Sequence, residues 1–126
     1  AVHALAYPLG GKFKMAHGVS NALMLPFVLR WNILGCASRL SQLAQRLHVA
    51  RGQHEIENAE RLVEFLHKFC RQLNIPASLQ QFGIQEEDLP QLAAEAIKVE
   101  RLLKNNPRRL NVQEIEAIYR EAYANG

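Results

Sequence analysis

The chain has 126 residues, of which 48% are hydrophobic and 21% charged, and its formal net charge is +3. This length and balance suit one domain with a sizeable core, and they exclude a disordered chain. The basic residues are interspersed with acids and form no dense run, which argues against a nucleic-acid partner.

The first part of the chain predicts two helices. An apolar face over residues 2–9 predicts a short helix, and the run Pro-Leu-Gly-Gly over 8–11 is expected to stop it. Almost wholly apolar sequence over 16–32 predicts a second helix that is buried on all sides. Within it, Pro26 is expected either to kink the helix or to free a backbone carbonyl near Ala22.

The middle of the chain continues this pattern. Leucines at helical spacing predict a helix over 36–48, and apolar residues stepping by three and four predict a longer one over 54–74. The segment "ASLQQFG" is expected to form a short turn of helix capped by Gly83. The segment over 86–104 begins with acidic residues, which favours one or two further helices there, and the sequence Asn-Asn-Pro ends them.

The last helix is expected to begin after Asn111, because Asn111 and Glu114 form a capping-box-like pair. Asn106, in the Asn-Pro-Arg segment before it, is expected to hold a backbone turn. Since no segment alternates as a half-buried strand does, the sequence predicts an all-α fold of about six to seven helices. A single helical domain over 1–126 is expected.

Side chains outside the apolar faces divide into two groups. Aromatic residues at helical spacing are expected in the core, namely Phe27, Trp31 and Phe69. Histidines with polar neighbours are expected at the surface, namely His48, His54 and His67.

The apolar runs are shorter than a membrane span of ~18 residues, so no membrane association is expected. Cys36 and Cys70 lack CxxC spacing, which favours free thiols and a cytoplasmic location. The chain begins without Met, inside an apolar helix-like pattern and without a signal-peptide layout. We therefore expect it to be a piece of a longer protein.

Two histidines, His3 and His17, lie on either side of the Pro-Leu-Gly-Gly run. Both are set in apolar sequence, where an unpartnered imidazole costs free energy. Two imidazoles favour zinc or ferrous iron, but two ligands are too few for a tight site. Asp88 is the single aspartate and lies at a polar helix start. The alternative is that both are ordinary helix histidines. Asn21, one turn after His17, either faces the same site or makes a buried hydrogen bond.

Three blocks resemble a known family. "HALAYPLGGKFKMAHGVSNALMLPFVLRWN" resembles the His-Gly signature of the iron-containing (group III) alcohol dehydrogenases. "LNIPASLQQFGIQEEDLPQLAAEA" is similar to their Leu-Gly-Ile-Pro segment, and "NNPRRLNVQEIEAIYREAY" is similar to their terminal Asn-Pro-Arg segment. The resemblance covers nearly the whole chain and implies the C-terminal helical domain of the dehydroquinate synthase-like fold.

This resemblance implies a two-domain enzyme that interconverts alcohols and aldehydes or ketones by metal-assisted hydride transfer. His3 and His17 match two of its three metal-binding histidines, and the ion would be Fe²⁺ or Zn²⁺. The remaining histidine and an aspartate would lie upstream, together with the domain that binds NAD or NADP. A homo-oligomer is expected at full length, whereas this piece alone is expected to be inactive.

The chain departs from the commonest family pattern at Tyr7, where many members carry a further histidine near the nicotinamide and the proton path. Tyr7 would share a helix face with His3. Its phenol either passes a proton or is plain packing. Phe13 is expected to contact the cofactor or substrate, although a solvated loop is the alternative. Two other functions are a reductase of an activated acid such as maleylacetate, and a non-catalytic helical interaction module.

Overall fold

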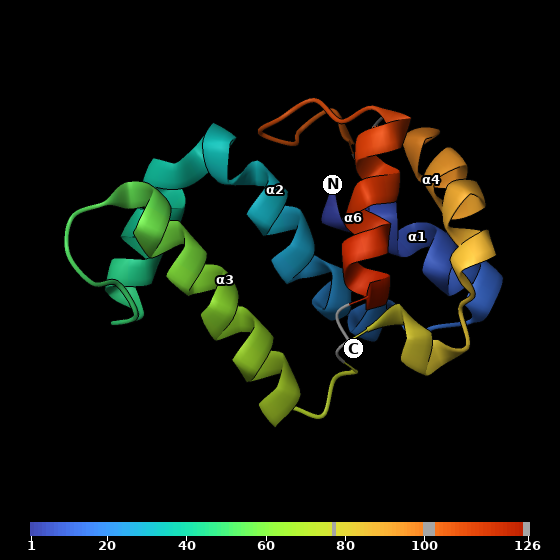
Figure 1. Ribbon diagram of the computed structural model, residues 1–126, viewed down its shortest axis with the longest axis horizontal. Helices are drawn as coiled ribbons and strands as arrows, with labels where there is room; N and C mark the ends of the chain where they lie inside the picture. The colour runs from blue at the N-terminus through green and yellow to red at the C-terminus, as the bar shows by residue number, and fades with distance from the viewer. Residues whose placement is uncertain (77, 100–102, 125–126) are drawn as a thin grey trace.

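The computed structural model describes residues 1–76, 78–99 and 103–124, and these are all-α, as the sequence predicts. Figure 1 shows a long bent helix, α2, lying between α3 on one side and a group of three helices on the other. The α-helices and 3-10 segments of the described residues are α1 (Val2–Phe13), α2 (His17–Arg46), α3 (Glu55–Gln72), η1 (Leu79–Phe82), η2 (Glu86–Asp88), α4 (Leu89–Ile97) and α6 (Val112–Ala124).

Helix α1 continues through the Pro-Leu-Gly-Gly run, so the predicted stop there is wrong. Pro8 removes one helical hydrogen bond, but Leu5 and Leu9 on the same helix are fully buried. Burial of this apolar face outweighs the weak local propensity. The helix ends instead at Phe13, and the capping residue Lys14 has a left-handed backbone with a φ of 54°.

Helix α2 joins the two helices predicted over 16–32 and 36–48, so the described residues contain one helix where two were expected. Its non-helical residue is Cys36, with φ −150° and ψ 28°, and Figure 1 shows the bend. Pro26 instead frees a carbonyl, as predicted: the oxygen of Ala22 accepts the thiol of Cys70 at 3.7 Å.

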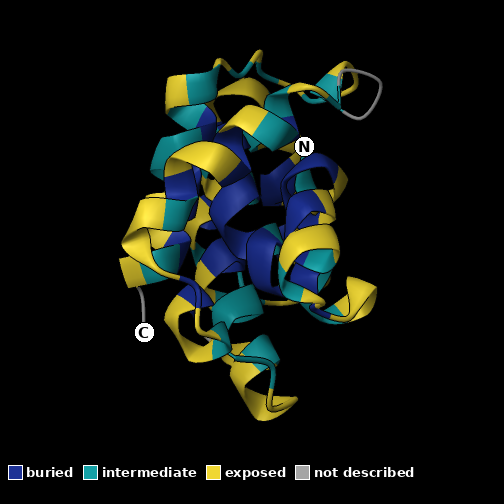
Figure 2. Ribbon diagram, turned by 90° about the vertical axis from the view of Figure 1, so that its right-hand side faces the viewer, coloured by how far each residue is buried: buried dark blue, intermediate teal, exposed yellow. Residues whose placement is uncertain are grey.

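The buried side chains form two clusters, and Figure 2 shows the larger one as a dark centre between the helices. The main core joins α1, α4, α6 and the first half of α2. The smaller core joins the second half of α2 to α3, and its buried members are Ile33, Leu40, Ala44, Ala59, Leu62 and Val63. The helical pair α2–α3 therefore has its own apolar contact beside the main core.

Helix α6, near the end of the chain, is hydrogen-bonded to α1 at its beginning. The predicted capping pair is confirmed, since the Glu114 amide donates to Asn111 Oδ1 at 2.8 Å and the Asn111 amide donates to Glu114 Oε1 at 3.1 Å. Tyr119 is fully buried, and its hydroxyl donates to the carbonyl oxygen of Leu5 at 2.5 Å. Burial raises the pKa of Tyr119, so the phenol stays protonated and keeps this bond.

The segment before α6 packs against the bend of α2. Asn106 and Asn32 exchange amide hydrogen bonds of 2.8 Å in both directions. Asn106 also donates to the carbonyl of Arg108, so it holds the backbone turn as predicted. Gly35 permits this approach, because a Cβ there would lie 2.9 Å from Cγ of Arg108.

The short segments follow the prediction in part. Gly83 ends η1 with a φ of 77°, as expected, although Ala77 at the start of the predicted turn lies outside the described residues. The helix predicted over 86–104 divides into η2 and α4, and α4 ends at Ile97. The part over 100–102 is also outside the description.

Two of the side-chain expectations are wrong. Phe69 is 46% exposed, because it flanks rather than faces the side of α3 that packs on α2. His67 is half-buried, since its ring packs edge-on against Phe27 at 4.9 Å between centroids.

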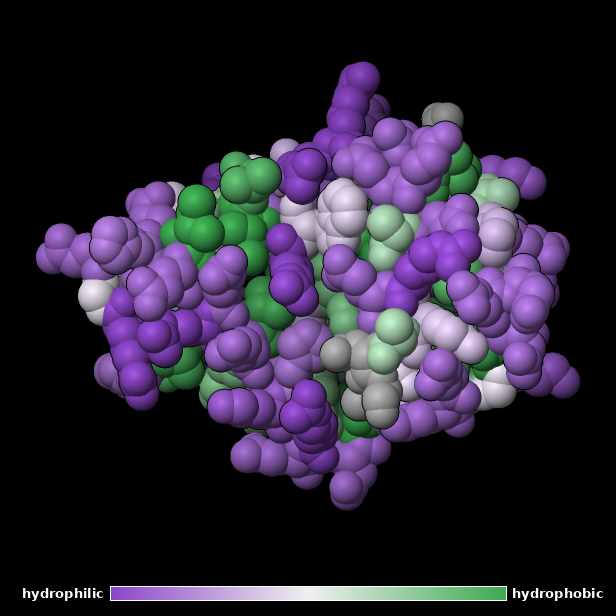
Figure 3. Space-filling view, in the orientation of Figure 1, coloured by the Kyte–Doolittle hydropathy of each residue, from purple (hydrophilic) through white to green (hydrophobic). Residues whose placement is uncertain are grey.

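The surface in Figure 3 is mainly hydrophilic, with hydrophobic side chains over the middle of α2. His48 and His54 are exposed, as predicted.

By length and composition alone, helix α2 is long and apolar enough to cross a membrane. In this fold it contacts α1, α3 and α6, as the central helix of a packed domain does. The two halves of α2 belong to different cores, which accounts for its apolar character on several faces.

Candidate metal centre

His3 and His17 meet because the chain turns back along α1. From His3 to the end of the helix the backbone rises about 15 Å. The linker Lys14–Ala16 returns over a comparable distance, since four extended steps span at most ~14 Å. It passes close to Gly10, where a Cβ would lie 3.4 Å from the carbonyl oxygen of Met15. The linker therefore runs back close to the helix, and it brings His17 beside His3.

The two imidazole rings lie 5.7 Å apart between centroids, with 27° between their planes. His3 is in the first turn of α1 and His17 is the first residue of α2. A zinc–nitrogen bond is about 2.0–2.1 Å long, so two imidazoles on one ion have centroids roughly 5 Å apart. The observed separation is close to that value. Both side chains are exposed, so their rings are free to turn toward one ion; the apolar sequence around them does not bury them.

These two imidazoles do not complete a metal site by themselves. Over 1–76, 78–99 and 103–124 no group of three or more His, Cys, Asp or Glu side chains is placed to hold an ion. Asp88 is engaged elsewhere, because its Oδ2 accepts the amide of Gln85 at 2.9 Å in the cap of η2. Within the described residues, therefore, no further ligand joins His3 and His17.

Tyr7 shares the exposed face of α1 with His3, one helical turn further along. Its side chain is 61% exposed, and it borders a hollow of about 440 Å³ that Lys12, Glu95 and Lys98 also line. Phe13 is half-buried and packs against the main core. The structure therefore brings Tyr7 and His3 onto one face and places Phe13 on another side of the helix.

Ser20 and Asn21, in the first turns of α2, lie close to His17 in the sequence. Ser20 is fully buried, and its hydroxyl donates to the carbonyl of His17 at 3.0 Å, which fastens the first turn of α2. Asn21 Oδ1 is buried and accepts no hydrogen bond from the described residues. The hydrogen bond expected as one alternative for Asn21 is thus not formed by that oxygen. Sequence reasoning does not single out Ser20, because a serine near a helix start is common in many contexts.

Comparisons with known proteins identify the family of the chain. The family model described as "Fe-containing alcohol dehydrogenase family, C-terminal" matches residues 1–123. The chain is 41% identical over 124 residues to long-chain-alcohol dehydrogenase 1 of Geobacillus thermodenitrificans, covering 98% of this chain and 31% of that protein. It is 35% identical over 123 residues to 1,3-propanediol dehydrogenase of Klebsiella pneumoniae, covering 97% of this chain and 32% of that protein.

Solved structures show the same fold. The crystal structure of 1,3-propanediol oxidoreductase superposes with a TM-score of 0.91 at 35% identity, covering 97% of this chain and 32% of that one. Alcohol dehydrogenase from Oenococcus oeni superposes with a TM-score of 0.90 at 31% identity over the same shares of the two chains. The chain spans about a third of the length of these relatives. It belongs to the Fe-containing alcohol dehydrogenase family and corresponds to the C-terminal region of that family.

Proposed function

We propose that this chain is the C-terminal, metal-binding part of a longer NAD(P)-dependent alcohol dehydrogenase, which interconverts alcohols and aldehydes or ketones. The observation that carries the proposal is the pair of imidazoles, His3 and His17, at 5.7 Å. The relatives named above support it, because they are alcohol and propanediol dehydrogenases. The ion would be Fe²⁺ or Zn²⁺, for which imidazole is a suitable ligand.

In this proposal each residue has a distinct role. His3 and His17 would bind the ion as neutral imidazoles through one ring nitrogen each. When bound, the metal would supply Lewis-acid stabilisation of an alcohol oxygen, and the nicotinamide would be the hydride acceptor. Ser20 holds the carbonyl of His17 and so helps to orient the start of α2. The exposed face shared by His3 and Tyr7 leaves room for the substrate and for the rest of the protein.

The full-length protein tests this function directly. It is expected to reduce NAD⁺ or NADP⁺ in the presence of a primary alcohol or diol, and to lose that activity when a chelator removes its metal. Adding Fe²⁺ or Zn²⁺ back should restore the rate, because the ion supplies the electrophile. Metal analysis and cofactor absorbance are measured on the same samples. Unchanged activity in metal-free protein would contradict the proposal, and absence of both metal and activity would favour an interaction module.

We also propose that Tyr7 takes part in proton transfer at this face. An unperturbed phenol has a pKa of about 10, so it is a poor acceptor at neutral pH, whereas histidine titrates near 6.5. Tyr7→His in the full-length protein is therefore expected to raise kcat/KM for alcohol oxidation roughly tenfold near neutral pH. The rate should rise with pH through an inflection near about pH 6.5, as the new imidazole loses its proton.

The pH dependence of kcat/KM, with Tyr7→Phe beside it, checks this role. Tyr7→Phe keeps the ring and removes the hydroxyl, so it should show no new inflection. If the profile of Tyr7→His has the same shape as that of the parent protein, position 7 lies outside the proton path and Tyr7 is a packing or surface residue.

A further inference from the structure

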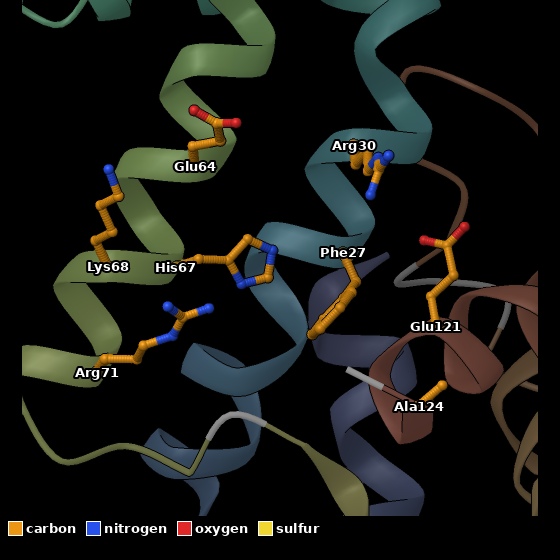
Figure 4. Close-up of a pocket in the computed structure, with 8 residues that line it drawn as sticks. All are labelled: Phe27, Arg30, Glu64, His67, Lys68, Arg71, Glu121 and Ala124. Carbon is orange, nitrogen blue, oxygen red and sulfur yellow. The ribbon is translucent and has the colours of Figure 1, made fainter. Parts of the chain in front are cut away.

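A second hollow, of about 560 Å³, lies away from the candidate metal centre and shares no residue with it. Figure 4 shows that α2, α3 and the end of α6 line it. Its floor is the buried ring of Phe27, against which the ring of His67 packs edge-on at 4.9 Å. Arg30 of α2 and Arg71 of α3 also line it. Two helices thus bring three nitrogen-bearing side chains around one aromatic surface.

The guanidinium groups in this hollow are not neutralised. Within the described residues, neither Arg30 nor Arg71 forms an ion pair or donates a side-chain hydrogen bond, and both are exposed. In Figure 4 the side chains of Arg71 and His67 extend from α3 toward α2, and Arg30 of α2 lies on the opposite side of the hollow. An arginine can offer two parallel N–H donors to one oxyanion, so this arrangement suits an anionic group.

Both arginines affect the same group, the imidazole of His67. Burial, then Arg71, then Arg30 lower the pKa of His67 below its ordinary value. The other charged groups that line the hollow are Lys68 and Glu64 of α3 and Glu121 of α6. Glu64 and Glu121 form no ion pair in the described part of the chain, and Lys68 points away from the opening in Figure 4. Burial and the two guanidinium groups therefore both disfavour the protonated imidazole when no anion is bound.

We propose that Arg30, His67 and Arg71 form a binding site for a small oxyanion, such as phosphate or a compact carboxylate, over the ring of Phe27. The guanidinium groups would donate to the oxygens, and the imidazole would add a donor when it takes up a proton. Glu64 and Glu121 also border the hollow, so its net positive charge is small and suits one compact anionic group better than a polyanion. The site shares no residue with the candidate metal centre, so its test does not depend on the proposed dehydrogenase chemistry.

His67 provides a local reporter of occupancy in the full-length protein. Its imidazole signal is followed by NMR in histidine-labelled protein, with His67→Gln used to assign it. Bound phosphate is expected to raise the pKa of His67 by about 1, because an adjacent negative charge favours the protonated ring. Sodium phosphate and sodium succinate are titrated separately, and their midpoints distinguish a phosphate ligand from a carboxylate ligand. Phosphate bound at a dinucleotide site elsewhere would not move this signal.

Matched variants make the test decisive. Arg30→Gln and Arg71→Gln should each raise the phosphate midpoint about tenfold or more, because each removes a charged donor. Arg46→Gln, an exposed arginine at the end of α2, should leave it unchanged. A His67 pKa that neither phosphate nor succinate moves would overturn the proposal. The proposal would also be overturned if sodium chloride at the same ionic strength raised the pKa of His67 equally. Equal phosphate midpoints in all three arginine variants would overturn it as well, because both results indicate general charge screening.

Discussion

His17→Ala in the full-length protein is expected to lower metal affinity more than a hundredfold and to abolish most alcohol oxidation, because loss of an outer-shell partner alone costs about 10- to 100-fold. A direct ligand supplies a metal bond rather than an orienting hydrogen bond. In the proposed site, His3 and His17 would be the two imidazoles from this chain, and their ring centroids lie 5.7 Å apart. Removing either leaves an ion with too few ligands for a tight site.

Elemental analysis after dialysis, followed by the steady-state rate, measures both effects. His54→Ala is the matched control, because His54 is likewise exposed and its side chain makes no cap hydrogen bond at the start of α3. That variant should keep its metal and its rate. A double variant lacking His3 and His17 should be little worse than either single variant, since ligands of one ion act as a unit. Full metal occupancy in His17→Ala would disprove the assignment of this residue.

The sequence was most informative where the signals are local. The capping pair Asn111 and Glu114 lies within one helical turn, and both of its hydrogen bonds form. The carbonyl that Pro26 frees was also predictable, because the missing N–H belongs to proline itself. Its partner was not, since Cys70 comes from α3, far along the chain. Backbone chemistry thus predicts which groups need partners, whereas packing decides which groups provide them.

The first helix shows where local signals fail. Pro-Leu-Gly-Gly is a strong break signal in isolation, yet α1 passes through it because Leu5 and Leu9 are anchored in the main core. The consequence reaches the candidate site. A loop at 8–11 would have let His3 and His17 converge directly, whereas the actual helix requires the linker Lys14–Ala16 to return beside Gly10. The pairing was predicted, but the way in which the backbone achieves it was not.

The candidate metal centre and the second hollow differ in how far sequence reasoning reaches them. His3 and His17 belong to one short signature, so the motif pointed to both together. Arg30, His67 and Glu121 come from three helices and meet only in the folded chain. His67 was expected at the surface because its sequence neighbours are polar, and its contact with Phe27 was not visible from them. Sites that are assembled from distant helices need the structure.

Leu5→Ala is expected to destabilise the domain by about 2–5 kcal/mol, because it leaves a cavity in a closely packed core. Leu5 is fully buried, and it lies between His3 and Tyr7 on the helix that carries both. The mutation keeps the backbone carbonyl that accepts the Tyr119 hydroxyl, so the loss comes from the side chain. The denaturant midpoint of the full-length protein should therefore fall, with a parallel change in the near-UV signal of its aromatic residues.

Tyr7→Ala provides the opposite case on the same helix. Tyr7 is 61% exposed, so its removal should change the free energy of unfolding by less than about 0.5 kcal/mol while altering the pH profile of the enzyme. Leu5→Ala should instead keep that profile in the fraction that remains folded. If Tyr7→Ala destabilises the protein as strongly as Leu5→Ala, then position 7 is covered by the rest of the polypeptide. In that case α1 does not present one face to the core and another to the chemistry.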